Sequence, residues 1–133
     1  MPVTTADIQT RQDIERLVDA FYQRVRADDL LGPIFDDVAR IDWAAHLPKM
    51  YAFWDAVLFG RAGFKGNPLL AHLRLARLTP LGAREFDRWL TLFDATLDEH
   101  FTGPVATEAR LRAARIATVM QHHIAGGGDV ARA

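Results

Sequence analysis

Two histidines lie among apolar and aromatic residues on separate segments, and their imidazoles are the side chains with the clearest chemistry. His72 ends the stretch "GRAGFKGNPLLAH", which begins at Gly60 as a loop rich in glycine. His46 lies upstream, on a strongly amphipathic segment with helical spacing. Imidazole is a standard axial ligand of haem iron. Two imidazoles on two helices, each in apolar surroundings, therefore suggest a buried planar metal cofactor.

Tyr22 and Trp89 extend this pattern to two further helices. Like His46, each is a side chain with a polar tip on a face that is otherwise apolar. Leaving a buried hydroxyl, imidazole or indole N–H unpaired costs roughly 1–3 kcal/mol, so a core with three such groups is expected to bind something polar. Bound O2 carries partial negative charge and accepts such hydrogen bonds. Each residue alone is more often an ordinary packed side chain, and His72 alone a helix or loop cap, so only the combination points to a cofactor.

The composition is that of one soluble globular domain. The chain has 133 residues, half of them hydrophobic, which is enough to bury a core. The 16 basic and 17 acidic residues include no basic run, which argues against nucleic-acid binding. The absence of cysteine excludes disulfides, thiolate metal sites and thioether-linked haem. With neither a signal peptide nor an apolar run of bilayer length, we expect a cytoplasmic protein without a membrane partner.

Apolar residues recur at helical spacing in the first half of the chain, and no strand alternation appears. The first stripe runs from Ile14 to Val25 and follows Thr10, which resembles a capping residue. Gly32-Pro33 predicts a turn. A second helix is expected from Asp42 or Trp43 to Leu58, with Pro48 tolerated in its first turn.

The second half has the same helical character. A short helix is expected from Pro68 to about Leu78. Thr79-Pro80 resembles an N-cap and a first-turn proline, and it precedes the apolar stripe of Phe86–Leu97. Gly103-Pro104 breaks that helix, and a last helix carries the stripe of Ala109–Ile124. The pattern predicts an all-α protein with about five or six helices.

Four segments together resemble the truncated haemoglobins, most of all the third group of that family. They are "FYQRVRADDLLGPIF" (21–35), "DWAAHLPKMYAFW" (42–54), "GNPLLAHLRL" (66–75) and "FDRWLTLF" (86–93). The likeness runs in order over about residues 8–120, nearly the whole chain. It implies a shortened globin fold, a two-over-two helical sandwich around b-type haem. We expect a single domain over 1–133, with its core at about 8–125 and a flexible tail at 126–133.

The resemblance also implies roles for individual residues. His72 is expected as the proximal iron ligand, with Tyr22, His46 and Trp89 on the distal side. His46 has a second expected role as a distal iron ligand when no exogenous ligand is bound. The other residues expected to line the haem pocket are Phe35, Met50, Phe53, Trp54, Leu69, Leu73 and Phe93. Phe64 departs from the pattern because relatives often have tyrosine there, and the stretch 75–83 is longer than in relatives.

These features predict a haem protein that reversibly binds O2, NO and CO, with oxygen binding or transport as its role. No catalytic residue is assigned, and ligand binding is favoured over a dedicated enzymatic function. One alternative is an NO-detoxifying or peroxidase-like haem enzyme, which needs an external reductase because the chain has no flavin or nicotinamide domain. A remote alternative is a helical interaction module without cofactor, its aromatic stripes being plain core. A monomer or weak dimer is expected.

Overall fold

The chain folds into helices and their connections throughout the part that the structure describes. The structure is a computed structural model that describes residues 5–64 and 68–125, without the side chains of residues 68–70. Within these ranges there is no β-strand, and extended chain pairs at an isolated bridge between Ala6 and Phe101. None of the helices described is both long and apolar enough to cross a membrane. The all-α prediction is confirmed, and the expected tail at 126–133 lies outside the described residues.

Helix α1 (Arg11–Ala27) begins at the predicted cap. The hydroxyl of Thr10 accepts a hydrogen bond from the backbone N–H of Asp13, and the Asp13 carboxylate accepts one from the N–H of Thr10. Two N–H groups that the helix leaves unpaired are thereby satisfied. The predicted stripe is buried along its whole length and consists of Ile14, Leu17, Val18, Phe21, Tyr22 and Val25.

Two short helical segments replace the turn predicted at Gly32-Pro33. They are α2 (Leu31–Pro33) and a π-helix, η1 (Ile34–Val38). The carboxylate of Asp28 caps them by accepting hydrogen bonds from the N–H groups of Leu30 and Leu31. Gly32 is required because a β-carbon there would lie 2.6 Å from the carbonyl oxygen of Arg26. This close approach folds α2 and η1 back onto the end of α1.

Helix α3 (Trp43–Phe59) matches the second predicted helix within a residue. The prediction that Pro48 sits in the first turn is wrong, because the helix begins at Trp43 and Pro48 lies in the second turn. Its nitrogen cannot donate to the carbonyl of Ala44 there. The helix ends at Gly60, whose φ of 67° is in the left-handed region that glycine adopts without strain.

Helices α4 (Pro68–Ala76) and α5 (Ala83–His100) follow. The predicted N-cap at Thr79 is wrong, since α5 begins four residues later. Its entry is fixed instead by Glu85, whose carboxylate accepts a hydrogen bond of 2.8 Å from the N–H of Gly82. A glutamate at this third helical position satisfies the N-cap backbone as in a capping box.

Helix α6 (Pro104–Ala125) starts at the predicted break, with Pro104 in its first position. Gly103, which precedes it, has no side chain to act as a cap. Asp7 supplies the cap from the far end of the chain, because its carboxylate accepts hydrogen bonds from the N–H groups of Val105 and Ala106 (3.0 and 2.9 Å). The N-terminal segment is thereby tied to the start of the last helix.

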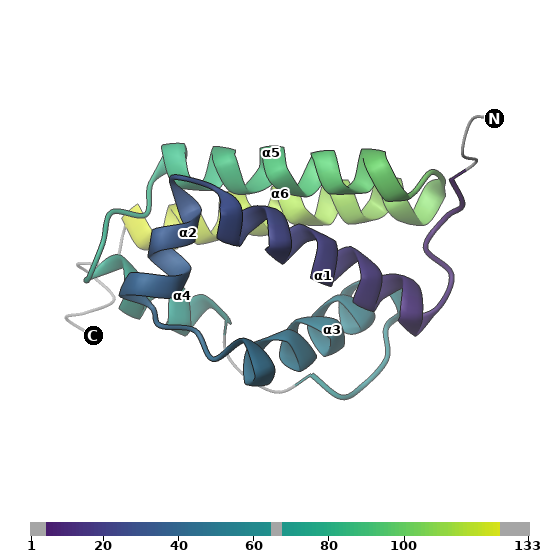
Figure 1. Cartoon of the computed structure of the whole chain (residues 1–133), viewed down its shortest axis with the longest axis horizontal. Helices are drawn as coiled ribbons and strands as arrows, with labels where there is room; N and C mark the ends of the chain where they lie inside the picture. Colours follow the sequence, from purple (N-terminus) through teal and green to yellow (C-terminus); the bar gives the residue numbers. More distant parts are fainter. Residues whose placement is uncertain (1–4, 65–67, 126–133) are drawn as a thin grey trace.

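The helices form two packed pairs, α1 with α3 and α5 with α6, laid one over the other in the two-over-two arrangement expected from the sequence (Figure 1). Helices α5 and α6 pack against each other, and α1 packs against both α3 and α5. Helix α4 contacts α6, and α2 contacts α1 and α5, so these two short helices lie at one end of the sandwich (Figure 1). The buried stripe of α1 lies between the pairs and meets Trp54 of α3 and Phe93 of α5 in one core. The remaining space between the helices is the candidate site.

Candidate cofactor site

A cavity of about 290 Å³ lies between the helices and is walled mostly by apolar side chains. Its size is close to the lower end of the range of about 300–1,000 Å³ for small-molecule and cofactor sites. The fold brings together residues from α1, η1, α3, α4 and α5 on its walls. The predicted site residues that line it are Tyr22, Phe35, His46, Met50, Phe53, Trp54, His72 and Trp89.

Two residues predicted to line the pocket are placed differently, and a third has a side chain outside the described residues. Phe93 does not line the cavity; it is 1% exposed and stacks against Trp54 and Trp89, so it forms the core behind these two indoles. Leu73 is half-buried on α4 but is not part of the cavity wall. Leu69 belongs to α4, and its side chain lies outside the described residues.

Helix α6 forms a wall that the sequence did not assign to the site. Ile116, Ala117 and Met120 line the cavity, although their periodicity had marked them only as the apolar face of a helix. Leu81 and Phe86 also line it, from the connection before α5 and the start of that helix. Apolar spacing was the available signal for the four that lie on helices, and it cannot distinguish a cavity wall from ordinary core; Leu81, in the connection, gave no such signal.

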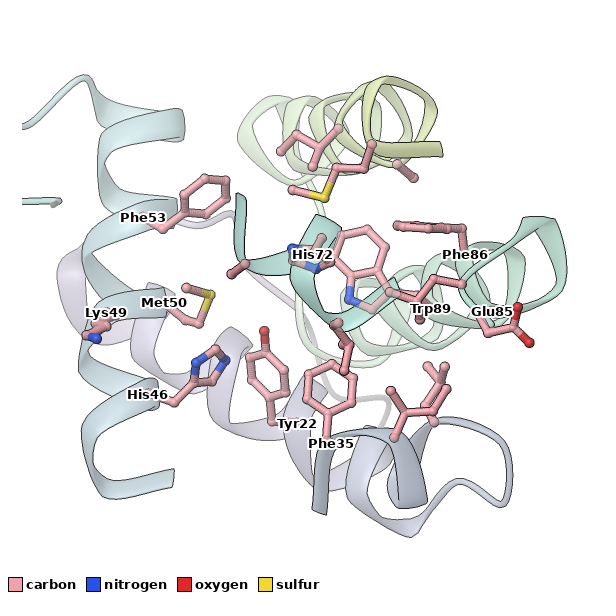
Figure 2. A pocket seen from close by; sticks show the side chains of 18 of the residues that line it. Tyr22, Phe35, His46, Lys49, Met50, Phe53, His72, Glu85, Phe86 and Trp89 are labelled. Atoms are coloured by element: carbon pink, nitrogen blue, oxygen red, sulfur yellow. The ribbon is translucent and has the colours of Figure 1, made fainter. Parts of the chain in front are cut away.

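Tyr22 directs its hydroxyl into the cavity from α1 (Figure 2). The side chain is 7% exposed, and burial raises the pKa of its phenol above the ordinary value. The ring is packed edge-on against Phe35 and His46, with centroid distances of 5.9 and 5.4 Å. Tyr22 is therefore a neutral hydrogen-bond donor in a fixed position.

His46 faces the same space from α3 and has an orphaned polar atom. Its Nε2 is buried and has no hydrogen-bond partner among the described residues. Burial lowers the pKa of the imidazole, with smaller contributions from the positive charges of Lys49 and His72. The ring is therefore neutral at pH 7. A buried polar atom without a partner is unfavourable, which is an argument that this atom serves a ligand.

Trp89 lies on the opposite wall, on α5, with its indole nitrogen turned towards the cavity (Figure 2). Its ring stacks on Phe93 at 5.7 Å with an angle of 11° between the planes, and Phe93 stacks on Trp54 at 5.0 Å and 20°. Phe21 meets both Trp89 and Phe93 edge-on. This aromatic stack holds the indole rigidly, so its N–H is preorganised as a third donor.

His72 lines the cavity from α4. In Figure 2 its imidazole lies between the side chains of Tyr22 and His46 and the ring of Phe86. It is close enough to His46 to affect that residue's pKa. Imidazoles from α3 and α4 thus face one apolar space, as the two histidine-bearing segments predict.

Glu85 also borders the cavity, and its carboxylate is held by the backbone. The hydrogen bond from Gly82 lowers the pKa of Glu85 although burial opposes this, and Arg84 donates to the other carboxylate oxygen at 3.1 Å. Both hydrogen bonds are made with residues at the start of α5, so Glu85 caps this helix at the edge of the site.

The helix order, the two-over-two packing and a cavity faced by imidazoles from two helices define a protein of the globin class. Residues 7–125 match the family model described as bacterial-like globin. The chain is 32% identical over 115 residues to Group 3 truncated hemoglobin ctb of Campylobacter jejuni. The aligned region covers 84% of this chain and 88% of that protein. The crystal structure of group III truncated hemoglobin from Campylobacter jejuni superimposes with a TM-score of 0.79 at 31% identity, covering 91% and 95% of the two chains. The chain belongs to the truncated haemoglobins, in their third group.

Membership of the family implies a haem cofactor and binding of small gaseous ligands. The described walls fit a haem in three respects. They are largely apolar, they include the imidazole of His72, and they include His46, whose buried Nε2 has no hydrogen-bond partner among the described residues. His72 has the donor type that holds haem iron, while Phe35 and Phe53 offer aromatic surface to a porphyrin.

Proposed function

We propose that the protein binds haem b non-covalently and reversibly binds O2, NO and CO next to Tyr22, His46 and Trp89. The observation that carries this proposal is the buried, unpartnered Nε2 of His46, which faces the same apolar cavity as His72. The absence of cysteine supports non-covalent attachment, because it leaves no thiol for a thioether link.

His72 is the proposed proximal ligand, and the iron supplies the site at which a diatomic molecule binds. The other three side chains act on that molecule. Tyr22 and Trp89 each have one N–H or O–H to donate, and neither group has a hydrogen-bond partner among the described residues. Neutral His46 donates from Nε2 in one tautomer and presents a lone pair in the other.

The test of the haem proposal is the absorption spectrum of the purified protein, before and after dithionite and CO. A Soret band that shifts on reduction and again with CO supports haem with an exchangeable site. His72→Ala should lose this band or bind haem far more weakly, because it removes the imidazole that would hold the iron. His122→Ala is the matched control, since His122 is exposed on α6. A folded wild-type chain that stays colourless after haemin is added would refute the proposal.

His46 is also proposed to coordinate the iron when no exogenous ligand is present. The support is its buried Nε2 and a pKa that keeps the imidazole neutral, because only neutral imidazole has a lone pair to give. The ferric protein is then low-spin, and His46→Ala converts it to high-spin at pH 7. An unchanged ferric spectrum in His46→Ala rules this role out.

The same three donors support an alternative function, NO dioxygenation or a peroxidase-like reaction. Groups that hydrogen-bond a ligand in a haem pocket also assist cleavage of an O–O bond. Steady-state turnover of NO or peroxide with an external reductase is expected for such an enzyme. A reaction that stops after one equivalent favours the ligand-binding protein.

A further inference from the structure

Trp43 lies behind the cavity wall and contacts three side chains that form it. The residue begins α3, one turn before His46, and is not itself part of the wall. Its ring meets those of Tyr22 at 5.3 Å, Phe35 at 5.9 Å and His46 at 5.6 Å between centroids. The orientation of this one indole therefore limits how far Tyr22 and His46 can move.

The indole of Trp43 is itself held by two charged residues on its outer side. Its N–H donates to Oδ1 of Asp36 at 2.8 Å, and Nε of Arg26 lies 3.5 Å from the same oxygen. The guanidinium carbon of Arg26 is 4.8 Å from the centre of the Trp43 ring, within range of a cation–π interaction. Each of the three residues contacts the other two, and they come from α1, η1 and α3. We refer to Arg26, Asp36 and Trp43 as the latch.

The π-helix explains how one short segment places one residue in the cavity wall and the next residue against Trp43, behind that wall. In η1, the N–H of Ala39 donates to the carbonyl of Ile34 (2.8 Å), which gives a wider turn than in an α-helix. Phe35 and Asp36 are consecutive residues in this turn. Phe35 enters the cavity wall, whereas Asp36 turns to the Trp43 indole. Single π-turns recur at functional sites, and this one connects the cavity to the latch.

We propose that the latch is a positioning device that fixes Tyr22 and His46 in the orientation in which they hydrogen-bond a ligand in the cavity. None of its three side chains touches that ligand. The inference rests on the proposed function of the cavity and adds residues to it. Hydrogen bonds weaken steeply when the donor angle falls, so a small rotation of either ring weakens the ligand's hydrogen bonds.

The experiment compares Asp36→Ala, Asp36→Asn and Asp37→Ala in the haem-loaded protein. Asp37 is the matched control, because it is the exposed neighbouring carboxylate in the same π-helix. Asp36→Ala should speed O2 dissociation about three- to tenfold, the effect of weakening one hydrogen bond, and should shift or split the C–O stretching band of the CO form. Asp36→Asn should restore most of the wild-type behaviour, since its amide oxygen still accepts the Trp43 N–H. Asp37→Ala should match wild type.

The vibrational band separates positioning from simple stability, because a merely destabilised fold lowers the unfolding temperature without moving the band. An unchanged rate and band in Asp36→Ala overturn the proposal. Equal effects in Asp37→Ala also overturn it, since they would show that any change in the π-helix alters the rate and the band. Trp43→Phe perturbs the donor end of the same bond and should reproduce the Asp36→Ala band.

A haem-free measurement keeps the two proposals distinguishable. If the wild-type chain takes up no haem, the proposed function fails, and the latch is then tested by the NMR signals of the His46 and Tyr22 rings. Asp36→Ala should shift these signals and speed hydrogen exchange of the Trp43 indole N–H, whereas Asp37→Ala should do neither. Ring signals that stay fixed in Asp36→Ala refute the latch.

Discussion

The hydroxyl of Tyr22 keeps its proton over the working pH range, because burial raises the pKa of the phenol. Tyr22→Phe should therefore remove a permanent hydrogen-bond donor from the cavity and speed O2 dissociation roughly fivefold to tenfold, the equivalent of about 1 kcal/mol. Stopped-flow mixing of the O2 form with excess CO measures this rate.

Tyr51 offers a matched control for that measurement. It is the other tyrosine of the chain, and its hydroxyl donates to Asp19 between α1 and α3 rather than towards the cavity. Tyr51→Phe should leave O2 dissociation at the wild-type rate. If Tyr22→Phe behaves in the same way, the hydroxyl of Tyr22 does not reach the bound ligand.

At the scale of single residues, helical periodicity predicted which helix face a side chain lies on. It did not predict whether that side chain lines the cavity or packs behind its wall. Tyr22, His46 and Trp89 reach the cavity from the apolar stripes to which the sequence assigned them. Phe93 lies one turn from Trp89 on the same face, yet it packs behind the wall. Depth depends on how neighbouring helices close around a side chain, and no spacing within one helix contains that information.

Helix α6 depends on a cap from a residue distant in sequence. Asp7 supplies the oxygen that Gly103 lacks, and Asp7→Ala should lower the free energy of unfolding by about 1 kcal/mol, a typical value for a lost N-cap. Asp7→Asn should lose less at pH 7, because its single amide oxygen can replace one of the two carboxylate oxygens that accept from Val105 and Ala106. Urea unfolding followed by circular dichroism measures both, and equal stability of Asp7→Ala and wild type would show that the cap is not needed.

The pH dependence of this cap has a defined sign. Burial favours a higher pKa for Asp7, but hydrogen bonds from Val105, Ala106 and Ile8 outweigh it and hold the pKa below 3.8. A carboxylate with a lowered pKa in the folded state stabilises the fold above its unfolded pKa of about 3.9. That contribution is lost as the pH falls through the lower, folded value. Asp7→Asn should therefore show a smaller loss of stability than wild type between pH 4 and pH 3.

At the scale of elements, local rules predicted those helices whose ends are fixed by nearby residues. The start of α1 followed from Thr10 and Asp13, because a capping box is contained in four consecutive residues. The start of α5 was predicted wrongly at Thr79, since Glu85 selects Gly82 as the cap instead. The π-helix η1 was missed altogether. Its shape depends on Gly32 packing against the backbone of α1, a tertiary contact that has no local pattern.

At the scale of the whole molecule, a buried carboxylate on α3 pairs with one arginine that precedes this helix in the sequence and with another that follows it. Asp55 is 4% exposed and pairs with Arg11 at the start of α1 (3.2 Å) and with Arg61 after α3 (3.4 Å). Asp55→Ala should destabilise the protein by roughly 1–2 kcal/mol. The value is below that for a fully buried pair because both arginines are about half exposed and regain water.

Asp87 provides the control for Asp55, since it is an exposed aspartate on α5 whose side chain has no ion pair among the described residues. Asp87→Ala should change the unfolding free energy by less than about 0.5 kcal/mol. Thermal and urea unfolding of both variants measure the difference. If Asp55→Ala is as stable as Asp87→Ala, the Asp55 pairs contribute nothing to the joining of α1 and α3.

The helix that carries His72 is short, and its described side chains are at most partly buried. Helix α4 has nine residues, a length at which an isolated helix is marginal in water. None of its described side chains is fully buried, and its principal packing partner is α6. Coordination of iron by His72 would add a strong contact at the middle of α4. We therefore expect the amide hydrogens of α4 to exchange fast in the haem-free protein and much more slowly once haem is bound.

Amides in the middle of α1 are the internal reference for this hydrogen-exchange measurement. That helix has a capping box and a stripe buried to 7% exposure or less, so its exchange should be slow in both forms. Selective protection of α4 by haem follows from a ligand bond made by His72. Protection of α4 that is equal with and without haem would mean that the fold alone orders this helix. A gain of protection spread evenly over α1 and α4 would mean that haem acts by filling the cavity, with no special part for His72.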